Sequence, residues 1–445
     1  MLFKSIVPET MAKLYADSKN QISSKRKNDA IKRGDYYHSE QDDYTLENMS
    51  TWMIEPEALK PLQINIVRKV IDNLSMVYFK PAKRTVNGTE RDTELFNQIA
   101  KDSALDMTMK QASKFTKLHK TILLRVVWRN GNLEIDILTP DILDVVIGDS
   151  PRDLRKIMVT NWPESGKTSD VTYSLWTADT FQRLDWIGAV IEEEPNPYKT
   201  LPFVPCWDSL PIESFWVKGG GDLISAQDAI NEKLTDLMYI IRQQGFGIGY
   251  IKSGNHGPAG IGTLETVKAS PGTFVILPTD PNAEIGFVSP NAPIKEVWET
   301  IQAIIQQTAI ANGLSAHSLT AEPVNESGIS KIVSNNELME KRQDDVDLWR
   351  RYEARLFEIC KLVWNTHNTG RKISDTADMN VDFAEITQAS QEIEQSEKWQ
   401  TLIDAGQASP VDWVLSRNPD LSREQAIEYL RNVKKESVEF NSPMI

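Results

Sequence analysis

Few residues of this chain have the type and spacing that metal binding or catalysis needs. The histidines stand far apart, and no Cys-x-x-Cys pair occurs; the five positions are His38, His119, His256, His317 and His367. Local zinc sites are built from His and Cys ligands at short, regular spacings. The sequence therefore predicts no metal centre.

The segment Ser165-Gly166-Lys167-Thr168 comes nearest to a phosphate-binding loop. A Walker motif requires a glycine five residues before Gly166, and that position is Asn161. The residues that follow, 171–175, predict a strand where the motif needs a helix. We interpret this segment as an exposed loop. Gly245, Gly247 and Gly249 follow a helix, whereas a dinucleotide-binding fingerprint follows a strand and begins a helix, so these glycines indicate a hinge.

Two charged runs also suggest chemistry. Asp344, Asp345 and Asp347 lie within a predicted helix, where adjacent carboxylates point to different sides, so a two-metal nuclease cluster is not expected. A solvated helix face is the expectation for them. A solvated face is also expected for the basic cluster at Lys25, Arg26, Lys27, Lys32 and Arg33. No catalytic residue and no cofactor is predicted.

Composition limits the class of protein. The 445 residues are 40% hydrophobic and 25% charged, which is ordinary for a globular chain of two to four structural units. The net charge of −14 repels DNA, which argues against a tight DNA-binding protein but permits a conduit for DNA. No run of about eighteen apolar residues and no secretory signal are seen. Cys206 and Cys360 cannot form a disulfide framework; they fit a reducing cytosol and are expected to be buried.

Periodicity predicts the elements of the first half. Apolar residues three and four apart predict a helix over residues 61–79. From residue 121 to 217 the pattern changes to strands, with a hairpin turn at Asn130-Gly131. Residues 195–205, with four prolines, are expected to be extended and loop-like. These features predict one α/β domain around a single sheet.

Long helices dominate the second half. After Gly219-Gly220-Gly221 a helix is predicted over residues 222–244, and a small β segment (250–251, 274–277 and 285–288) separates it from a second helix over 293–313. A polar loop over 315–330 precedes a third helix over 331–365 and a strand over 380–386. The remainder is predicted to be helical over 388–405, 410–417 and 421–435, with helix-start signals at Ser409-Pro410 and at Ser422 with Gln425.

The order of these elements resembles the portal proteins of tailed double-stranded-DNA bacteriophages. Three stretches carry the resemblance: residues 201–241 with the run Gln-Asp-Ala-Ile-Asn at 227–231, residues 325–342 (NESGISKIVSNNELMEKR), and residues 381–436. An early helix over 63–80 is similar as well. No stretch before residue 60 matches the family pattern.

The resemblance implies an α+β wedge with named parts. Residues 1–218 and 331–385 would form the wing, and 219–244 and 293–314 the stem helices. Residues 245–292 would form the clip, 315–330 the tunnel loop and 386–445 the helical crown. Twelve copies would form a ring at one capsid vertex, assembled in the host cytoplasm and incorporated into the virion. The implied partners are double-stranded DNA without sequence specificity, the terminase large subunit, head–tail adaptor proteins and capsid or scaffold proteins.

Within that ring the resemblance places a channel lining on the second stem helix and the tunnel loop. The apolar positions Val297, Ile301, Ile304, Ile305 and Ile310 would pack inward. The opposite side presents amides, and no charged residue follows Glu299 before Gly313, which suits sliding of DNA. The expected lining residues are Gln302, Gln306, Glu322, Asn325, Glu326, Ser327 and Lys331.

Two other functions stay open on the sequence alone. One is an enzyme of DNA packaging, an ATPase or nuclease, which would need the phosphate loop or the carboxylate cluster that are missing here. The other is a capsid scaffold protein without a channel. Only the portal would form closed rings with a central hole.

Overall fold

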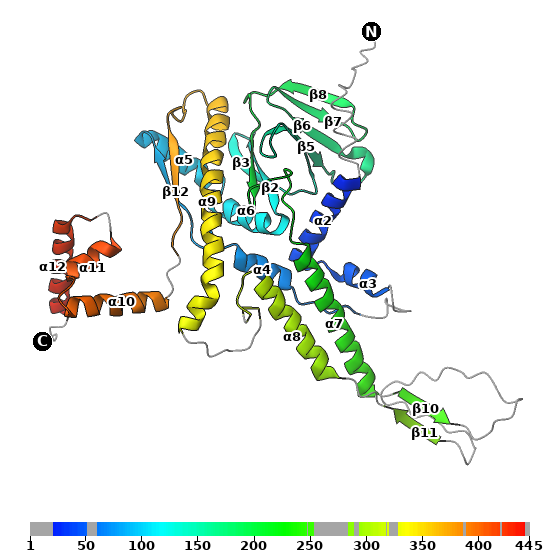
Figure 1. The fold of residues 1–445 in the computed structure, drawn as a ribbon. Helices are drawn as coiled ribbons and strands as arrows, with labels where there is room; N and C mark the ends of the chain where they lie inside the picture. Colours follow the sequence, from blue (N-terminus) through cyan, green and yellow to red (C-terminus); the bar gives the residue numbers. More distant parts are fainter. Residues whose placement is uncertain are drawn as a thin grey trace, which may run out of the picture. The chain divides into compact units, whose positions relative to one another are not determined.

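The computed structural model describes residues 21–50, 60–246, 248–252, 284–288, 293–316, 318–319, 328–385, 389–418 and 421–440. Two compact units divide the chain, residues 1–383 and 384–445 (Figure 1). Helices and antiparallel sheets occupy separate stretches, so the fold class is α+β, as predicted. None of the described helices is long and apolar enough to cross a membrane.

A three-stranded sheet in the order β3-β2-β9 holds the main core. Strand β2 (Thr121–Arg129) pairs with β3 (Asn132–Leu138) and with β9 (Phe203–Trp207). Asn130 and Gly131 have φ of 51° and 83° at the tip of the predicted hairpin, in the left-handed region that such two-residue turns require. Strand β9 begins inside the segment that its prolines had marked as loop, because its main chain pairs with the buried strand β2.

A second sheet corrects the expectation of a single central sheet. Strands β4 (Leu143–Ile147), β5 (Leu154–Asn161), β6 (Thr172–Trp176), β7 (Thr180–Leu184) and β8 (Val190–Pro195) form an antiparallel meander. One face covers a small core of its own, made of Met158, Val171, Tyr173, Leu175 and Leu184. Strand pattern alone could not reveal the division, because β4 and β9 both contribute apolar side chains to the main core but pair with different strands.

The long helix α9 (Gly328–His367) spans the core of the first unit, with bounds close to the predicted ones (Figure 1). Its buried side chains Trp349, Phe357 and Val363 share a hydrophobic cluster with β2 and β9. Beside it lie α5 (Glu90–Asp102), α6 (Leu105–His119) and a two-stranded sheet. That sheet pairs β1 (Lys83–Asn87) with β12 (Asp378–Asp382), which are almost 300 residues apart in the chain.

Five helices, together with Leu118 of α6, surround a second hydrophobic core. These are α2 (Gln21–His38), α3 (Asp42–Ser50), α4 (Ile66–Leu74), α7 (Gly221–Phe246) and α8 (Ile294–Ala311). Helix α4 is shorter than the predicted 61–79. The Asn65 side chain accepts a hydrogen bond from the Arg68 backbone N–H, which starts the helix there and leaves Ile64 partly exposed.

A hairpin of β10 (Ile248–Lys252) and β11 (Glu284–Val288) connects α7 to α8. It confirms two of the three expected β segments; the third, residues 274–277, lies outside the described residues.

The second unit contains α10 (Ala389–Asp404), α11 (Pro410–Arg417) and α12 (Arg423–Phe440). Both helix-start signals are confirmed. Ser409 and Asp412 form a reciprocal capping box with Pro410 in the first turn. Ser422 and Gln425 exchange backbone hydrogen bonds of 2.8 and 3.2 Å in the same manner.

Candidate functional site

The helices α7 and α8 lie side by side (Figure 1). The resemblance identified both as stem helices and placed the channel lining on α8 and the loop that follows it. The contact between the two helices is built from apolar side chains one turn apart on each helix. Ile230, Leu234 and Leu237 of α7 are buried with Ile301, Ile305 and Ala309 of α8. The pair is therefore fixed by a continuous apolar stripe on each helix.

The exposed side of α8 includes fewer of the glutamines than the sequence predicted. The side chains buried against the rest of the protein are Ile301, Ile305, Thr308 and Ala309. Gln302 and Gln306 lie at the edge of this buried stripe and are half-buried. Ala303 and Gln307 lie on the open side. Ile310, which we had expected to pack inward, is 50% exposed because it lies off the axis of that stripe.

The remaining predicted lining residues cannot be located as side chains. Glu322, Asn325, Glu326 and Ser327 lie outside the described residues. Lys331 belongs to the first turn of α9 by its backbone. The structure therefore brings only Gln302 and Gln306 together on one helix.

Buried amides hold the helix pair to the preceding helices. Gln227 and Asn231 of α7 are 1% and 0% exposed. The Gln227 Oε1 accepts hydrogen bonds from the backbone N–H groups of Ile66 (2.8 Å) and Val67 (3.2 Å) at the start of α4. Asn231 donates to the Gln41 side chain at 2.9 Å. Sequence reasoning noticed Gln227 and Asn231 only as part of a family-like run and missed this role, because Gln41 and Ile66 are distant in the chain.

The basic cluster of α2 is a set of structural contacts, which corrects the expected solvated face. Arg26 donates to the carbonyls of Pro140 (2.5 Å) and Leu143 (2.8 Å) and pairs with Asp144. Its guanidinium carbon also lies 4.0 Å from the centre of the Trp216 ring. These contacts join α2 to the second sheet.

The other end of α2 is held to α7. Lys32 pairs with Asp228 at 3.0 Å, and the Tyr36 hydroxyl donates to the same carboxylate. Arg33 donates to the Gly219 carbonyl at 2.6 Å, where the chain enters α7. Helix α2 thus connects the sheet to the helix pair, and only Lys25 of the five basic residues is fully exposed.

The acidic run of α9 is also only partly solvated. Asp344 and Asp347 are exposed, but Asp345 is 5% exposed and its carboxylate lies 2.8 Å from Lys117. Lys117 also pairs with Asp208 at 2.7 Å, and Lys120 pairs with Asp208 at 2.8 Å. Burial raises the pKa of Asp345 to about 6 although Lys117 opposes the shift. Asp208 has two lysine partners, which outweigh its burial and lower its pKa.

These contacts predict a pH effect on stability. The Asp345 carboxyl binds its proton more tightly in the folded chain, so its contribution to the free energy of unfolding decreases as pH rises from 3.8 to about 6. Asp345→Asn removes this decrease. Urea unfolding at pH 4.5 and pH 7 should therefore show the variant gaining stability relative to the native chain at the higher pH. Asp347→Asn, at an exposed position of the same helix, is the matched control and should follow the native profile; a parallel profile for Asp345→Asn would contradict the assignment.

A buried ion pair fixes α9 to the two-stranded sheet. Arg84 donates to both oxygens of Glu353, at 2.9 and 2.7 Å, and the Tyr78 hydroxyl donates to Glu353 at 2.8 Å. Glu353 is 0% exposed. Burial and the nearby Glu353 charge raise the pKa of Tyr78 well above its usual value, so the hydroxyl remains a donor.

The sequence motifs that resembled functional sites form no such site in the described part of the chain. Residues 163–171 form a turn and a short helical segment, and Lys167 is exposed, as expected for a loop. Within the described ranges no three His, Cys, Asp or Glu residues are grouped as a metal site would require. Cys206 and Cys360 are buried at 0% and 2% exposure, and burial raises the pKa of both thiols.

Comparison with known proteins gives one family and several similar structures. The family described as phage portal protein, SPP1 Gp6-like, matches residues 16–439. This match includes much of the region before residue 60 that the sequence patterns left unassigned. No curated protein matches the sequence.

Three of the similar solved structures come from gene transfer agent particles. A chain from the virion of the native particle is 13% identical with a TM-score of 0.44, covering 78% of this chain and 88% of that chain. One from the neck of the empty particle, computed with C6 symmetry, is 12% identical with a TM-score of 0.48 and covers 79% and 89%. One from the neck of the native particle, computed with C12 symmetry, is 11% identical with a TM-score of 0.43 and covers 78% and 88%.

Proposed function

Because the chain belongs to the phage portal protein family of the SPP1 Gp6-like type, we propose that twelve copies form a ring at one capsid vertex through which DNA is packaged and ejected. The single observation that carries this proposal is the family match over nearly the whole chain. The ring would assemble in the host cytoplasm and remain in the virion.

We assign the parts of the wedge as follows. Residues 1–218 and 331–385 form the wing, 219–244 and 293–314 the stem, 245–292 the clip, 315–330 the tunnel loop and 386–445 the crown. The paired helices α7 and α8, joined by a β hairpin, support the stem and clip assignments. The open side of α8, with Gln307 and Ala303 flanked by Gln302 and Gln306, would line the channel. No charged residue follows Glu299 on this helix, so no side chain there would hold phosphates.

Exposed apolar side chains on the helix pair support the ring itself. On α7 and α8 the exposed fractions are 50% for Met238, 42% for Ile241, 41% for Trp298 and 50% for Ile310. Clusters of exposed apolar residues mark protein–protein contacts, and a closed ring needs contacts between neighbouring copies. These side chains would be covered by the adjacent subunits.

Electron microscopy of the purified chain tests the proposal. Closed rings with a central hole are expected. Monomers, open filaments or closed particles without a hole would instead favour a scaffold protein without a channel.

The partners follow from the same assignment. The clip would bind the terminase large subunit during packaging and the head–tail adaptor proteins afterwards, while the wing would contact capsid or scaffold proteins. Rings in which a glycine–serine linker replaces residues 253–283 should therefore still assemble but no longer retain the terminase in a pull-down. Unchanged retention would place the docking surface elsewhere.

The tunnel loop would control the passage of DNA. The double variant Glu322→Lys and Glu326→Lys should slow packaging, because each new cation would gain a phosphate contact. The slowing should be larger at 50 mM than at 200 mM salt, and ring formation should be unaffected. The double variant Glu424→Lys and Glu428→Lys, on an exposed face of α12, is a control with the same charge change. Equal packaging rates for native and loop-variant rings at both salt concentrations would remove this loop from the channel.

We also propose that the chain has no catalytic role, so the packaging ATPase or nuclease is a separate protein. Purified rings should hydrolyse no ATP above the background of a mock purification, because Lys167 lies in a loop without the Walker spacing. ATP turnover that disappears in Lys167→Ala would contradict this.

A further inference from the structure

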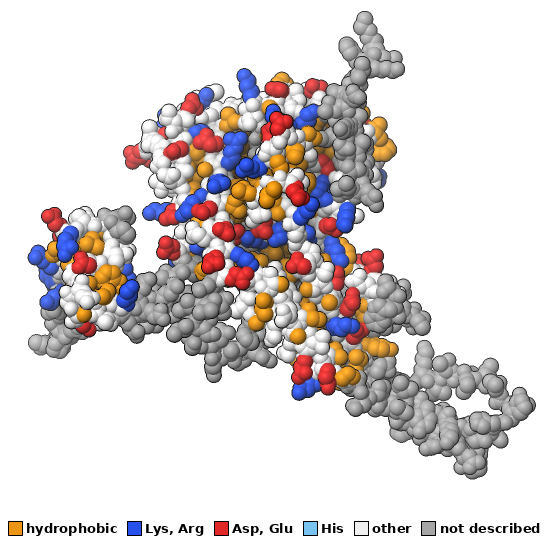
Figure 2. Space-filling model, in the orientation of Figure 1, with side chains coloured by type: hydrophobic (Ala, Val, Ile, Leu, Met, Phe, Trp, Pro, Cys, Tyr) orange, Lys and Arg blue, Asp and Glu red, His pale blue; other side chains and the backbone are white. Residues whose placement is uncertain are grey.

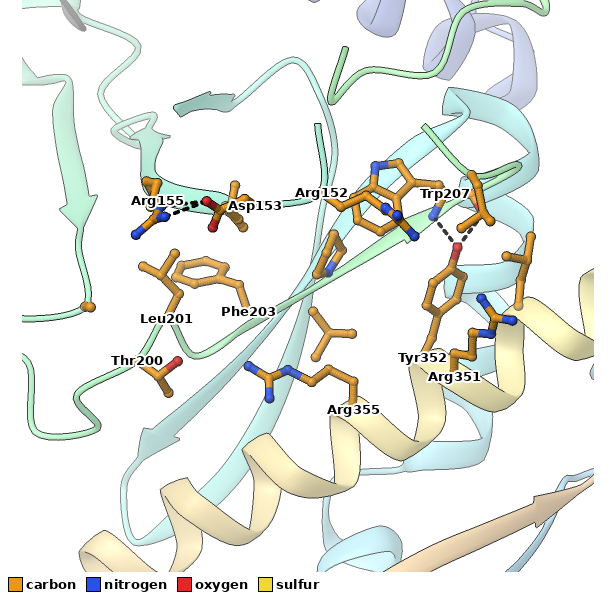
Figure 3. A pocket seen from close by; sticks show the side chains of 16 residues that line it. Arg152, Asp153, Arg155, Thr200, Leu201, Phe203, Trp207, Arg351, Tyr352 and Arg355 are labelled. Atoms are coloured by element: carbon orange, nitrogen blue, oxygen red, sulfur yellow. Dashed lines mark hydrogen bonds and ion pairs between the residues drawn. The ribbon is translucent and has the colours of Figure 1, made fainter. Parts of the chain in front are cut away.

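A pocket between α9 and the two sheets is lined by four arginines and only one acidic residue. It has a volume of about 520 Å3 and is lined by Arg152 and Arg155 near the start of β5 and by Arg351 and Arg355 of α9 (Figure 3). Asp153 is the single acidic residue of the lining, and it pairs with Arg155 at 2.7 Å. In a chain of net charge −14, this pocket is a local basic site.

The arginines lack partners that would explain their grouping. Within the described part of the chain, Arg152, Arg351 and Arg355 make no ion pair with a carboxylate. Arg351 and Arg355 stand one turn apart on the same face of α9, where like charges repel and weaken a helix slightly. Three guanidinium groups are therefore free to bind an anion.

Part of the pocket lining is apolar. Leu210, Leu348 and Phe203 contribute to it, and Leu210 is 43% exposed. The Tyr352 hydroxyl donates to the Trp207 carbonyl at 3.0 Å and accepts from the Trp207 backbone N–H at 3.1 Å, which fixes α9 against β9. Figure 2 shows Lys and Arg side chains next to hydrophobic ones on the side of the molecule turned to the viewer.

We propose that this pocket binds an acidic segment of a partner protein, with its carboxylates on the arginines and one large apolar side chain against the apolar part of the lining. Planar guanidinium groups match carboxylates with two parallel hydrogen bonds, and pockets of this size bind a short segment or a small ligand. A DNA duplex is too wide to enter, and its many phosphates would also meet the acidic remainder of the surface. A short peptide senses only charges within about 8 Å at physiological salt. The inference does not depend on the channel.

Fluorescence anisotropy on the full-length chain tests the proposal. The probe is a labelled octapeptide of alternating glutamate and leucine, compared with a peptide in which glutamine replaces glutamate and with a twelve-nucleotide single-stranded DNA. We expect saturable binding of the acidic peptide with a Kd below about 1 mM at 50 mM NaCl. The other two probes should bind at least about tenfold more weakly, and higher salt should weaken the acidic peptide.

Two variants separate the two halves of the pocket. Arg351→Gln with Arg355→Gln should weaken peptide binding about tenfold, and Leu210→Gln about fivefold. All three positions are exposed enough for the fold to tolerate the change. The double variant Arg371→Gln and Lys372→Gln removes two exposed cations of the same unit outside the pocket lining; it is the matched control and should bind like the native chain.

Three results would overturn the proposal. The first is a native chain that shows no saturable binding of the acidic peptide, and the second is binding that the double arginine variant leaves unchanged. The third is DNA binding as tight as the peptide and lost in the same variant, which would make the arginines a nucleic-acid contact.

Discussion

Replacing Glu353 with alanine is expected to reduce the free energy of unfolding by about 3–5 kcal/mol. Glu353 has no exposed surface, and it accepts two hydrogen bonds from Arg84 and one from Tyr78. Its removal leaves the Arg84 guanidinium, with a side chain 8% exposed, with only the partly exposed Asp106 as partner. The cost comes mainly from this stranded charge and from the unpaired Tyr78 hydroxyl.

Chemical denaturation followed by tryptophan fluorescence measures this effect, because Trp349 packs edge-on against Tyr78 with ring centres 5.3 Å apart. Glu358→Gln is a control on the same helix. Glu358 is partly exposed and pairs with Lys361, which keeps the Ala377 carbonyl as a partner, so a loss of about 0–1 kcal/mol is expected. A loss below about 1 kcal/mol for Glu353→Ala would show that the ion pair does not hold α9 to the sheet.

Replacing Ile301 with alanine is expected to destabilise the α7–α8 pair by about 2–5 kcal/mol. Ile301 is 0% exposed and lies in the apolar core shared with Ile230 and Leu234. The change removes three carbon atoms from a packed contact and leaves a cavity, and the higher helix propensity of alanine offsets only a few tenths of a kcal/mol. Fewer intact rings should then be seen, because the proposed stem depends on this pair.

Gln307→Ala is the control that shows whether the loss of stability in Ile301→Ala comes from the buried position of Ile301. Gln307 lies on the exposed side of the same helix. Its change in free energy of unfolding should stay within about 0.5 kcal/mol, with ring yield unchanged. Ring micrographs and denaturation curves for the two variants give the comparison. Equal stability of Ile301→Ala and the native chain would contradict the packing of this helix pair.

Local patterns determined the elements whose signals lie within a few residues of each other. The turn at Asn130-Gly131 requires positive φ, which these residues adopt readily, and the hairpin follows. The capping boxes at Ser409 and Ser422 started α11 and α12 at the predicted places. The order of the elements is also a property of the sequence, and together with the stretches 201–241, 325–342 and 381–436 it predicted the portal family that the comparison then showed.

Contacts between distant residues decided what the charged and polar side chains do. The sequence predicted Arg26 to be a solvated cation, but in the structure it binds Asp144, which is 118 residues away in the chain. The sequence predicted Asp345 to be a surface carboxylate, but in the structure it is buried and pairs with Lys117 of α6. The division into two sheets likewise depends on which strand pairs with β2.

Sequence periodicity could not predict these contacts, because it indicates only which side of a helix or strand is apolar. It does not report which other element covers that side, nor which polar group is buried at its border. The sequence by itself therefore determined the long helices of the second half, their order and the family. Only the tertiary structure decided that Gln302 and Gln306 flank a buried stripe, that Glu353 neutralises Arg84, and that four arginines meet at one pocket.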